Sequence, residues 1–73
     1  MQNMISVKFE GQHVLMSWNC LCEHVEPGTT LEYGRYTLPN GKTIYAVLDN
    51  GSLYFRNSDS SKVWEVFSNL LPE

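Results

Sequence analysis

Two Asn-Gly pairs, ten residues apart, constrain the fold of this chain more than any other feature. Asn40-Gly41 and Asn50-Gly51 each lie between runs in which apolar and polar residues alternate. A two-residue hairpin loop of type I′ needs a positive φ at both central positions, which Asn tolerates and Gly adopts freely. Two such loops predict three consecutive strands in an antiparallel meander.

Two-residue loops also fix which residues face each other across the strands. The loop at Asn50-Gly51 predicts that Leu48 faces Leu53, and the loop at Asn40-Gly41 predicts that Tyr36 faces Tyr45. The aliphatic face of the meander then collects Ile44, Ala46, Leu48, Leu53 and Phe55. The aromatic face collects Leu38, Tyr36, Tyr45, Val47, Tyr54 and Arg56. Because Tyr and Arg are favoured at protein interfaces, Tyr36, Tyr45, Tyr54 and Arg56 form the candidate binding patch.

The same tyrosines have an alternative structural interpretation. Tyrosine has a high strand propensity, so these rings would also serve simply to cover a sheet face or to pack under another hairpin. If the strands curl into a small barrel, the sequence leaves open whether the rings point inward or outward.

A further hairpin is predicted ahead of the meander. Residues 5–9 alternate between apolar and polar, Glu10-Gly11-Gln12 forms a turn, and the alternation continues over residues 14–22. The alternation stops between Glu23 and Thr30, where Pro27-Gly28 indicates a long loop.

The last segment has the period of an amphipathic helix. Residues 58–61 offer several N-cap residues, and Pro72 ends the helical pattern. The apolar stripe consists of Val63, Val66, Phe67 and Leu70, widened by Trp64 and Leu71. About eleven residues are marginal for a free helix, so we expect it to pack on the aliphatic face of the sheet.

Together these elements predict one small α+β domain over residues 1–73, with an N-terminal hairpin, a three-stranded meander and a helix on the sheet. A chain of this length buries only about 60% of the surface that its unfolded form exposes. It contains no catalytic or cofactor motif, so the sequence favours a non-catalytic protein without a cofactor.

The charge balance indicates the kind of partner. Five Lys and Arg against eight Asp and Glu give a net charge of −3, which disfavours nucleic acid and favours a larger protein with a basic or mixed surface. Glu23, Glu26 and Glu32 bracket the expected loop as an acidic rim. The working hypothesis is an inhibitor or regulator that occludes a nucleic-acid-handling partner. In size and charge alone it compares with small phage-encoded inhibitors such as anti-CRISPR proteins.

Two alternative functions have named residues. Binding of single-stranded nucleic acid to the aromatic face would require the cations Lys8, Arg35, Lys42 and Arg56 to gather beside it. A small zinc site would use Cys20, Cys22 and His24. In a regular strand these three would spread over about 13 Å, which is too far for one ion, so the cysteines are read as core residues.

The sequence shows no secretory signal and no run of roughly 18 apolar residues that would span a membrane. Cys20 and Cys22 flank a single residue and are expected to remain reduced thiols. We therefore expect a cytoplasmic protein without a membrane partner. An exposed strand edge would also allow two copies to pair.

Overall fold

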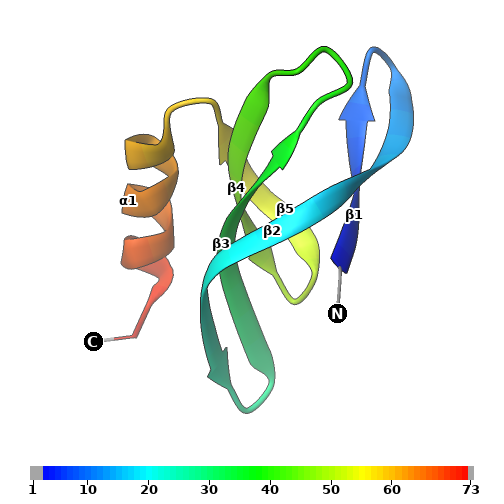
Figure 1. Ribbon diagram of the computed structural model, residues 1–73. Coiled ribbons are helices and arrows are strands. Elements are labelled where there is room, and N and C mark those ends of the chain that lie inside the picture. Colours follow the sequence, from blue (N-terminus) through cyan, green and yellow to red (C-terminus); the bar gives the residue numbers. More distant parts are fainter. Residues whose placement is uncertain (1–2, 73) are drawn as a thin grey trace.

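A computed structural model describes residues 3–72 and shows a five-stranded antiparallel meander followed by one helix (Figure 1). The strands are β1 (Asn3–Phe9), β2 (Gln12–Glu26), β3 (Thr29–Thr37), β4 (Thr43–Asp49) and β5 (Ser52–Asn57). The helix α1 spans Ser60–Leu70. Each strand pairs with its neighbours in the sequence, in the order β1-β2-β3-β4-β5. The predicted α+β fold class is confirmed.

Two of the hairpin turns are two-residue loops in which both central residues have positive φ. Asn50 and Gly51 both have positive φ, 51° and 84°, and connect Asp49 to Ser52 as the sequence predicts. Glu10 and Gly11 adopt the same conformation, with φ of 51° and 81°, between β1 and β2. The type I′ conformation matches the twist of the strands on either side, so both hairpins continue the curl of the sheet.

The predicted two-residue loop at Asn40-Gly41 is wrong. The amide of Gly41 donates to the Leu38 carbonyl at 2.8 Å, and the amide of Leu38 donates to the Lys42 carbonyl at 2.8 Å. Pro39 supplies the negative φ of a β-turn's second residue, so only Gly41, at φ 89°, is left-handed. This longer connection shifts the pairing by one residue, and Tyr36 faces Ile44 instead of Tyr45.

The register between β4 and β5 changes at Tyr54. Leu48 faces Leu53 as predicted, but Val47 then faces Phe55, because the register shifts between these two pairs. Tyr54 is the extra residue of this β-bulge and has no partner in β4. The predicted faces are therefore wrong beyond Leu53, since Phe55 joins the face of Val47.

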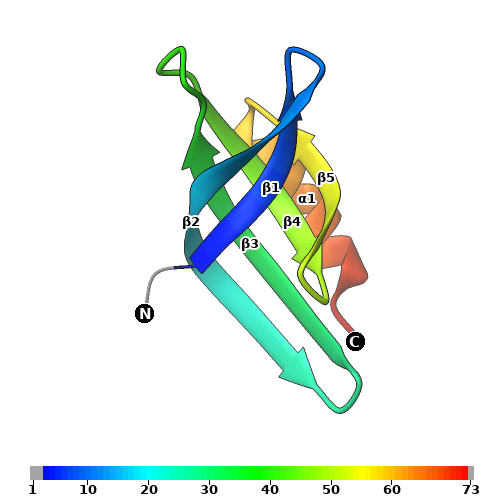
Figure 2. The same cartoon turned by 90° about the vertical axis from the view of Figure 1, so that its right-hand side faces the viewer.

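The long loop expected between Glu23 and Thr30 is a hairpin. β2 continues to Glu26, β3 begins at Thr29, and Pro27-Gly28 alone makes the turn. The hairpin projects beyond the rest of the sheet in both views (Figures 1 and 2). A second register shift lies between Cys20 and Cys22, where Leu21 is the additional residue.

The sheet curls into a half-barrel with a separate hydrophobic core on each face. The inner core lies between the β1–β2 hairpin and the rest of the sheet, and α1 covers the outer core from the opposite side (Figure 1). The buried residues of the inner core are Ile5, Val7, Met16, Trp18, Tyr36, Ala46 and Leu48. Those of the outer core are Leu31, Val47, Val63 and Phe67.

The helix has the predicted boundaries but lies on the other face of the sheet. Asp59 is the N-cap and accepts from the amide of Ser61 at 3.0 Å. Val63 and Phe67 are fully buried, and burial of such side chains contributes about 1.5–3 kcal/mol each. They pack on the face of Val47 rather than on the aliphatic face, because the β1–β2 hairpin already covers the latter.

Gly34 is required by close packing between β2 and β3. A Cβ at this position would overlap the Asn19 carbonyl and lie 2.7 Å from the Trp18 ring. We expect Gly34→Ala to lower the free energy of unfolding by about 1–3 kcal/mol, measured by urea denaturation, because such overpacking forces the backbone to move. The control is Thr37→Ala at an exposed position of the same strand. Equal stability of the two variants would contradict this role.

The two Asn-Gly pairs are expected to respond differently to alanine. Asn50 has a positive φ, and its Oδ1 accepts from the Thr30 amide at 2.8 Å. Asn50→Ala therefore loses this bond and a second one, from Nδ2 to the Gly28 carbonyl at 3.5 Å, and it strains the backbone, at a combined cost of about 2–3 kcal/mol. Asn40→Ala loses only the bond from the Lys42 amide, at 2.9 Å, and should cost about 1 kcal/mol. Chemical denaturation of both variants tests the order, and an equal cost would contradict the two turn types.

Candidate functional site

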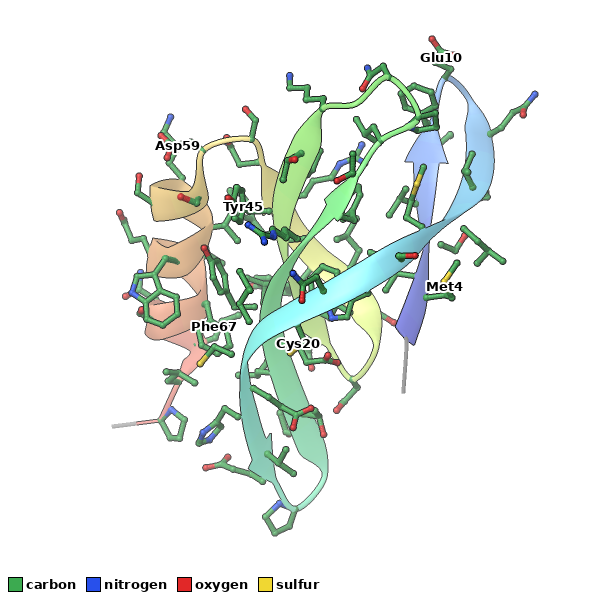
Figure 3. All side chains as sticks on the ribbon, in the orientation of Figure 1. Met4, Glu10, Cys20, Tyr45, Asp59 and Phe67 are labelled. Carbon is green, nitrogen blue, oxygen red and sulfur yellow. The ribbon has the colours of Figure 1, made fainter. Side chains whose placement is uncertain are left out.

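The predicted patch of three tyrosines and an arginine does not form. Tyr36 is only 2% exposed and belongs to the inner core, whereas Tyr45 packs against the outer core beneath the helix (Figure 3). Tyr54, at the bulge in β5, is 56% exposed. Arg56 lies on the side of Tyr36, whose hydroxyl accepts from its Nη1 at 3.4 Å. Only Tyr36 and Arg56 are in contact, and the four residues therefore do not share one surface.

A different aromatic cluster occupies the outer side of the sheet, with Tyr33 at its centre. The Tyr33 ring is stacked on Tyr45 at a centroid distance of 6.3 Å and meets Trp64 edge-on at 5.1 Å. The ring of Phe67, on the buried side of α1, completes the cluster with its centroid 6.0 Å from that of Tyr33. Trp64 is 46% exposed, and Tyr33 and Tyr45 are half-buried. Part of the cluster is thus core, and part of it is surface.

Arg35 adds a cation to the edge of this cluster. It is exposed and lies opposite Tyr45 in β4 on one side and opposite Asn19 in β2 on the other. Burial raises the pKa of Tyr33, as does nearby Tyr45, while a hydrogen bond to Ser60 and the charge of Arg35 act in the opposite direction. We call Tyr33, Arg35, Tyr45 and Trp64 the outer patch.

The sequence contains one signal for the outer patch. Pro39, placed before Asn40-Gly41, favours a β-turn that begins one residue earlier than a type I′ loop. With that turn, Tyr33 and Arg35 share a face with Tyr45, as observed. The contribution of Trp64 follows only from the position of the helix, which the alternation in the strands does not specify.

The three acidic residues of the expected rim are distributed over both faces of the β2–β3 hairpin. Glu23 faces Glu32 directly across the strands. Glu32 is half-buried and accepts from the indole nitrogen of Trp18 at 3.0 Å, so it has a packing role. Glu26 lies near the tip of the hairpin, 3.3 Å from Nε2 of His24. The three carboxylates therefore do not form one continuous surface.

The bulge at Leu21 separates the cysteines. Cys20 packs against the inner core and Cys22 against the outer core, so the two thiols point to opposite sides of the strand. His24 is close to Glu26. Within residues 3–72 no three His, Cys, Asp or Glu side chains are arranged to hold a metal ion.

Burial raises the pKa of the Cys20 thiol to about 11, helped by a hydrogen bond to Glu32 and by the charges of Glu32 and Glu23. At neutral pH this side chain is therefore a protonated thiol, which is a weak nucleophile. Its Sγ donates to the Cys22 carbonyl at 3.5 Å.

Comparison of the chain with protein-family models, with curated proteins and with solved structures finds no significant match. Among residues 3–72 no helix has the length and hydropathy needed to cross a membrane.

We expect Cys20 to resist alkylation at pH 8 and to become reactive as the pH approaches 11. A pKa raised above the ordinary thiol value of 9.0 means that folding favours the protonated thiol. Its contribution to stability is fully present below pH 9 and is lost as the pH rises through 11. Iodoacetamide kinetics on the Cys22→Ser variant would report Cys20 alone.

Glu32→Gln provides the matched control, because glutamine keeps an acceptor for Trp18 and removes the charge. In this variant the apparent pKa of Cys20 should fall. An apparent pKa at or below 9 in the protein with Glu32 intact would contradict the effect of burial.

Proposed function

We propose that this protein is a non-catalytic interaction module that binds a larger protein through the outer patch. The observation that supports this most is the exposure of Trp64, at 46%, within a cluster of four aromatic rings beside Arg35. Trp, Tyr and Arg are the residues most enriched among those that dominate binding energy at protein interfaces. No other aromatic cluster of this size lies among the described residues.

The outer patch is also preorganised. Tyr33 contacts Tyr45, Trp64 and Phe67, and these rings belong to β3, β4 and α1. Side chains held by regular elements lose little conformational entropy on binding, so more of the contact energy appears as affinity. Rings that project from mobile loops would lack this advantage.

The partner is expected to combine an apolar recess with a mixed or basic rim. The recess would receive the exposed ring of Trp64, and a carboxylate would pair with the guanidinium of Arg35. Asp59, the N-cap of α1, and Glu65, in the middle of α1, are exposed on the helix that carries Trp64. They would meet basic groups at the rim of the partner's recess. By covering such a surface, the protein would act as an inhibitor or regulator of a larger partner, including a nucleic-acid-handling one.

The distribution of cations favours a protein over a single-stranded nucleic acid at the outer patch. Lys8, Lys42 and Arg56 line a pocket at the end of the half-barrel, on the inner side of the sheet. Arg35 is the one cation assigned to the outer patch. Single strands require a cationic track alongside the aromatic platform, and the outer patch does not provide one.

Replacing exposed members of the outer patch should weaken binding of the partner while leaving the fold intact. In affinity capture from the source cell, Arg35→Ala and Trp64→Ala should each fail to retain the protein that the unaltered chain captures. In titrations with that purified partner, each substitution should weaken binding by about tenfold or more. The Arg35 side chain is exposed, so its removal should preserve the circular dichroism spectrum and thermal midpoint.

Tyr54→Ala is the matched control, because Tyr54 is an exposed ring outside the outer patch. This variant should bind the partner as tightly as the unaltered chain does. Retained binding by folded Arg35→Ala and Trp64→Ala together would overturn the proposal, as would loss of binding in Tyr54→Ala alone.

A further inference from the structure

A second candidate site lies at the end of the half-barrel where the β1–β2 and β3–β4 turns rise together (Figures 1 and 2). A pocket of about 540 Å³ opens between three segments that are distant in the sequence. These segments are residues 8–10, the stretch from 38 to 44, and residues 56–58. The volume falls within the range of about 300–1,000 Å³ that is typical of small-molecule sites.

Three of the five Lys and Arg residues of this acidic chain line the pocket. They are Lys8, Lys42 and Arg56. Among residues 3–72 none of the three lies within salt-bridge distance of a carboxylate, although Glu10 also lines the pocket. Lys8 contributes its backbone carbonyl, which accepts from Arg56, so Lys42 and Arg56 supply the positive charge of the pocket. A bound anion would relieve the repulsion between these two cations.

Two hydrogen bonds to residues of the half-barrel hold the Arg56 side chain at the wall of this pocket. Its Nη1 donates to the Lys8 carbonyl and to the Tyr36 hydroxyl, each at 3.4 Å. Both contacts use the same nitrogen, so Nε and Nη2 keep their N–H donors for a ligand. Because Tyr36 is buried, it provides a fixed reference for the guanidinium.

The two asparagine side chains at the pocket also present hydrogen-bond donors to a ligand. Asn40 Oδ1 accepts from the Lys42 amide at 2.9 Å, and Asn57 Oδ1 accepts from the Asp59 amide at 2.8 Å. Their carbonyl oxygens are thus engaged with the backbone, which leaves the NH₂ groups with hydrogen-bonding capacity. Apart from the carboxylate of Glu10, the polar groups of the pocket therefore favour a ligand rich in acceptors, such as an oxyanion.

An apolar wall completes the pocket. Phe9 is half-buried there, and Leu38 and Ile44 pack against the inner core. A free oxyanion would leave this wall unused. A ligand that carries its anion on a flat apolar body would fill both parts, with its ring against Phe9.

We propose that this pocket binds a phosphate monoester carried on an aromatic ring system, of which nucleoside monophosphates are the simplest class. A phosphate monoester carries a charge of about −1.5 to −2 at pH 7, which suits the two cations Lys42 and Arg56 better than a single carboxylate does. The guanidinium of Arg56 can donate two parallel hydrogen bonds to phosphate oxygens. The site is separate from the outer patch and does not depend on the proposed protein partner.

Titration with adenosine 5′-monophosphate, followed by backbone amide NMR shifts and by calorimetry, tests the proposal. Saturable binding with one site is expected, with the largest shifts at Lys8, Lys42 and Asn57. Lys42→Ala should weaken binding by about tenfold, because it removes one charge-assisted contact. Lys62→Ala is the matched control, since Lys62 is an exposed lysine on α1 outside the pocket, and it should leave the affinity unchanged.

Ligand controls separate the two halves of the pocket. Adenosine and inorganic phosphate should each bind at least about tenfold more weakly than the nucleotide, because each occupies only one half. Trp64→Ala should retain nucleotide binding, which separates this site from the outer patch. The proposal is overturned by the absence of saturable binding, by an unchanged affinity in Lys42→Ala, or by equal binding of adenosine, phosphate and the nucleotide.

Discussion

The burial of β4 on both faces is the constraint on which the rest of this structure depends. Ala46, Val47 and Leu48 are consecutive and almost fully buried, although successive side chains of a strand point in opposite directions. A sheet of this size can satisfy that pattern only if each face has its own cover. The curled β1–β2 hairpin covers one face and α1 covers the other, so the chain builds two small cores instead of one.

This division also determines which surfaces remain for binding. The helix leaves part of the outer face uncovered, since Trp64 on α1 is exposed and Tyr33 and Tyr45 in the sheet are only half-buried. The half-barrel remains open at one end, where Lys8, Lys42 and Arg56 meet around a pocket. Both candidate sites therefore lie where one of the two cores is incompletely covered, and they lie on different sides of the sheet.

Local signals in the sequence were sufficient for the order of the elements, but not for the β2–β3 turn or for the pairing of the strands. The Asp59 cap and the stripe through Val63 and Phe67 gave the helix its observed position, and Asn50-Gly51 forms the predicted turn. The predicted register was wrong at two places. Pro39 favoured a longer β3–β4 turn than Asn40-Gly41 alone predicts, and the bulge at Tyr54 added a residue to β5. Since side chains alternate with a period of two, a shift of one residue moved Tyr36 from the predicted surface into the core.

The sequence by itself therefore determined the α+β class, the strands of the meander and the amphipathic helix, because turn chemistry and hydrophobic period act over a few residues. Only the tertiary structure decided which face each core occupies, that Tyr33, Arg35 and Trp64 share a surface, and that Lys42 and Arg56 line one pocket at the open end. These outcomes depend on the curl of the sheet and on where the helix docks. Both are set by the combined packing of segments that lie far apart in the chain, and no local pattern encodes that packing.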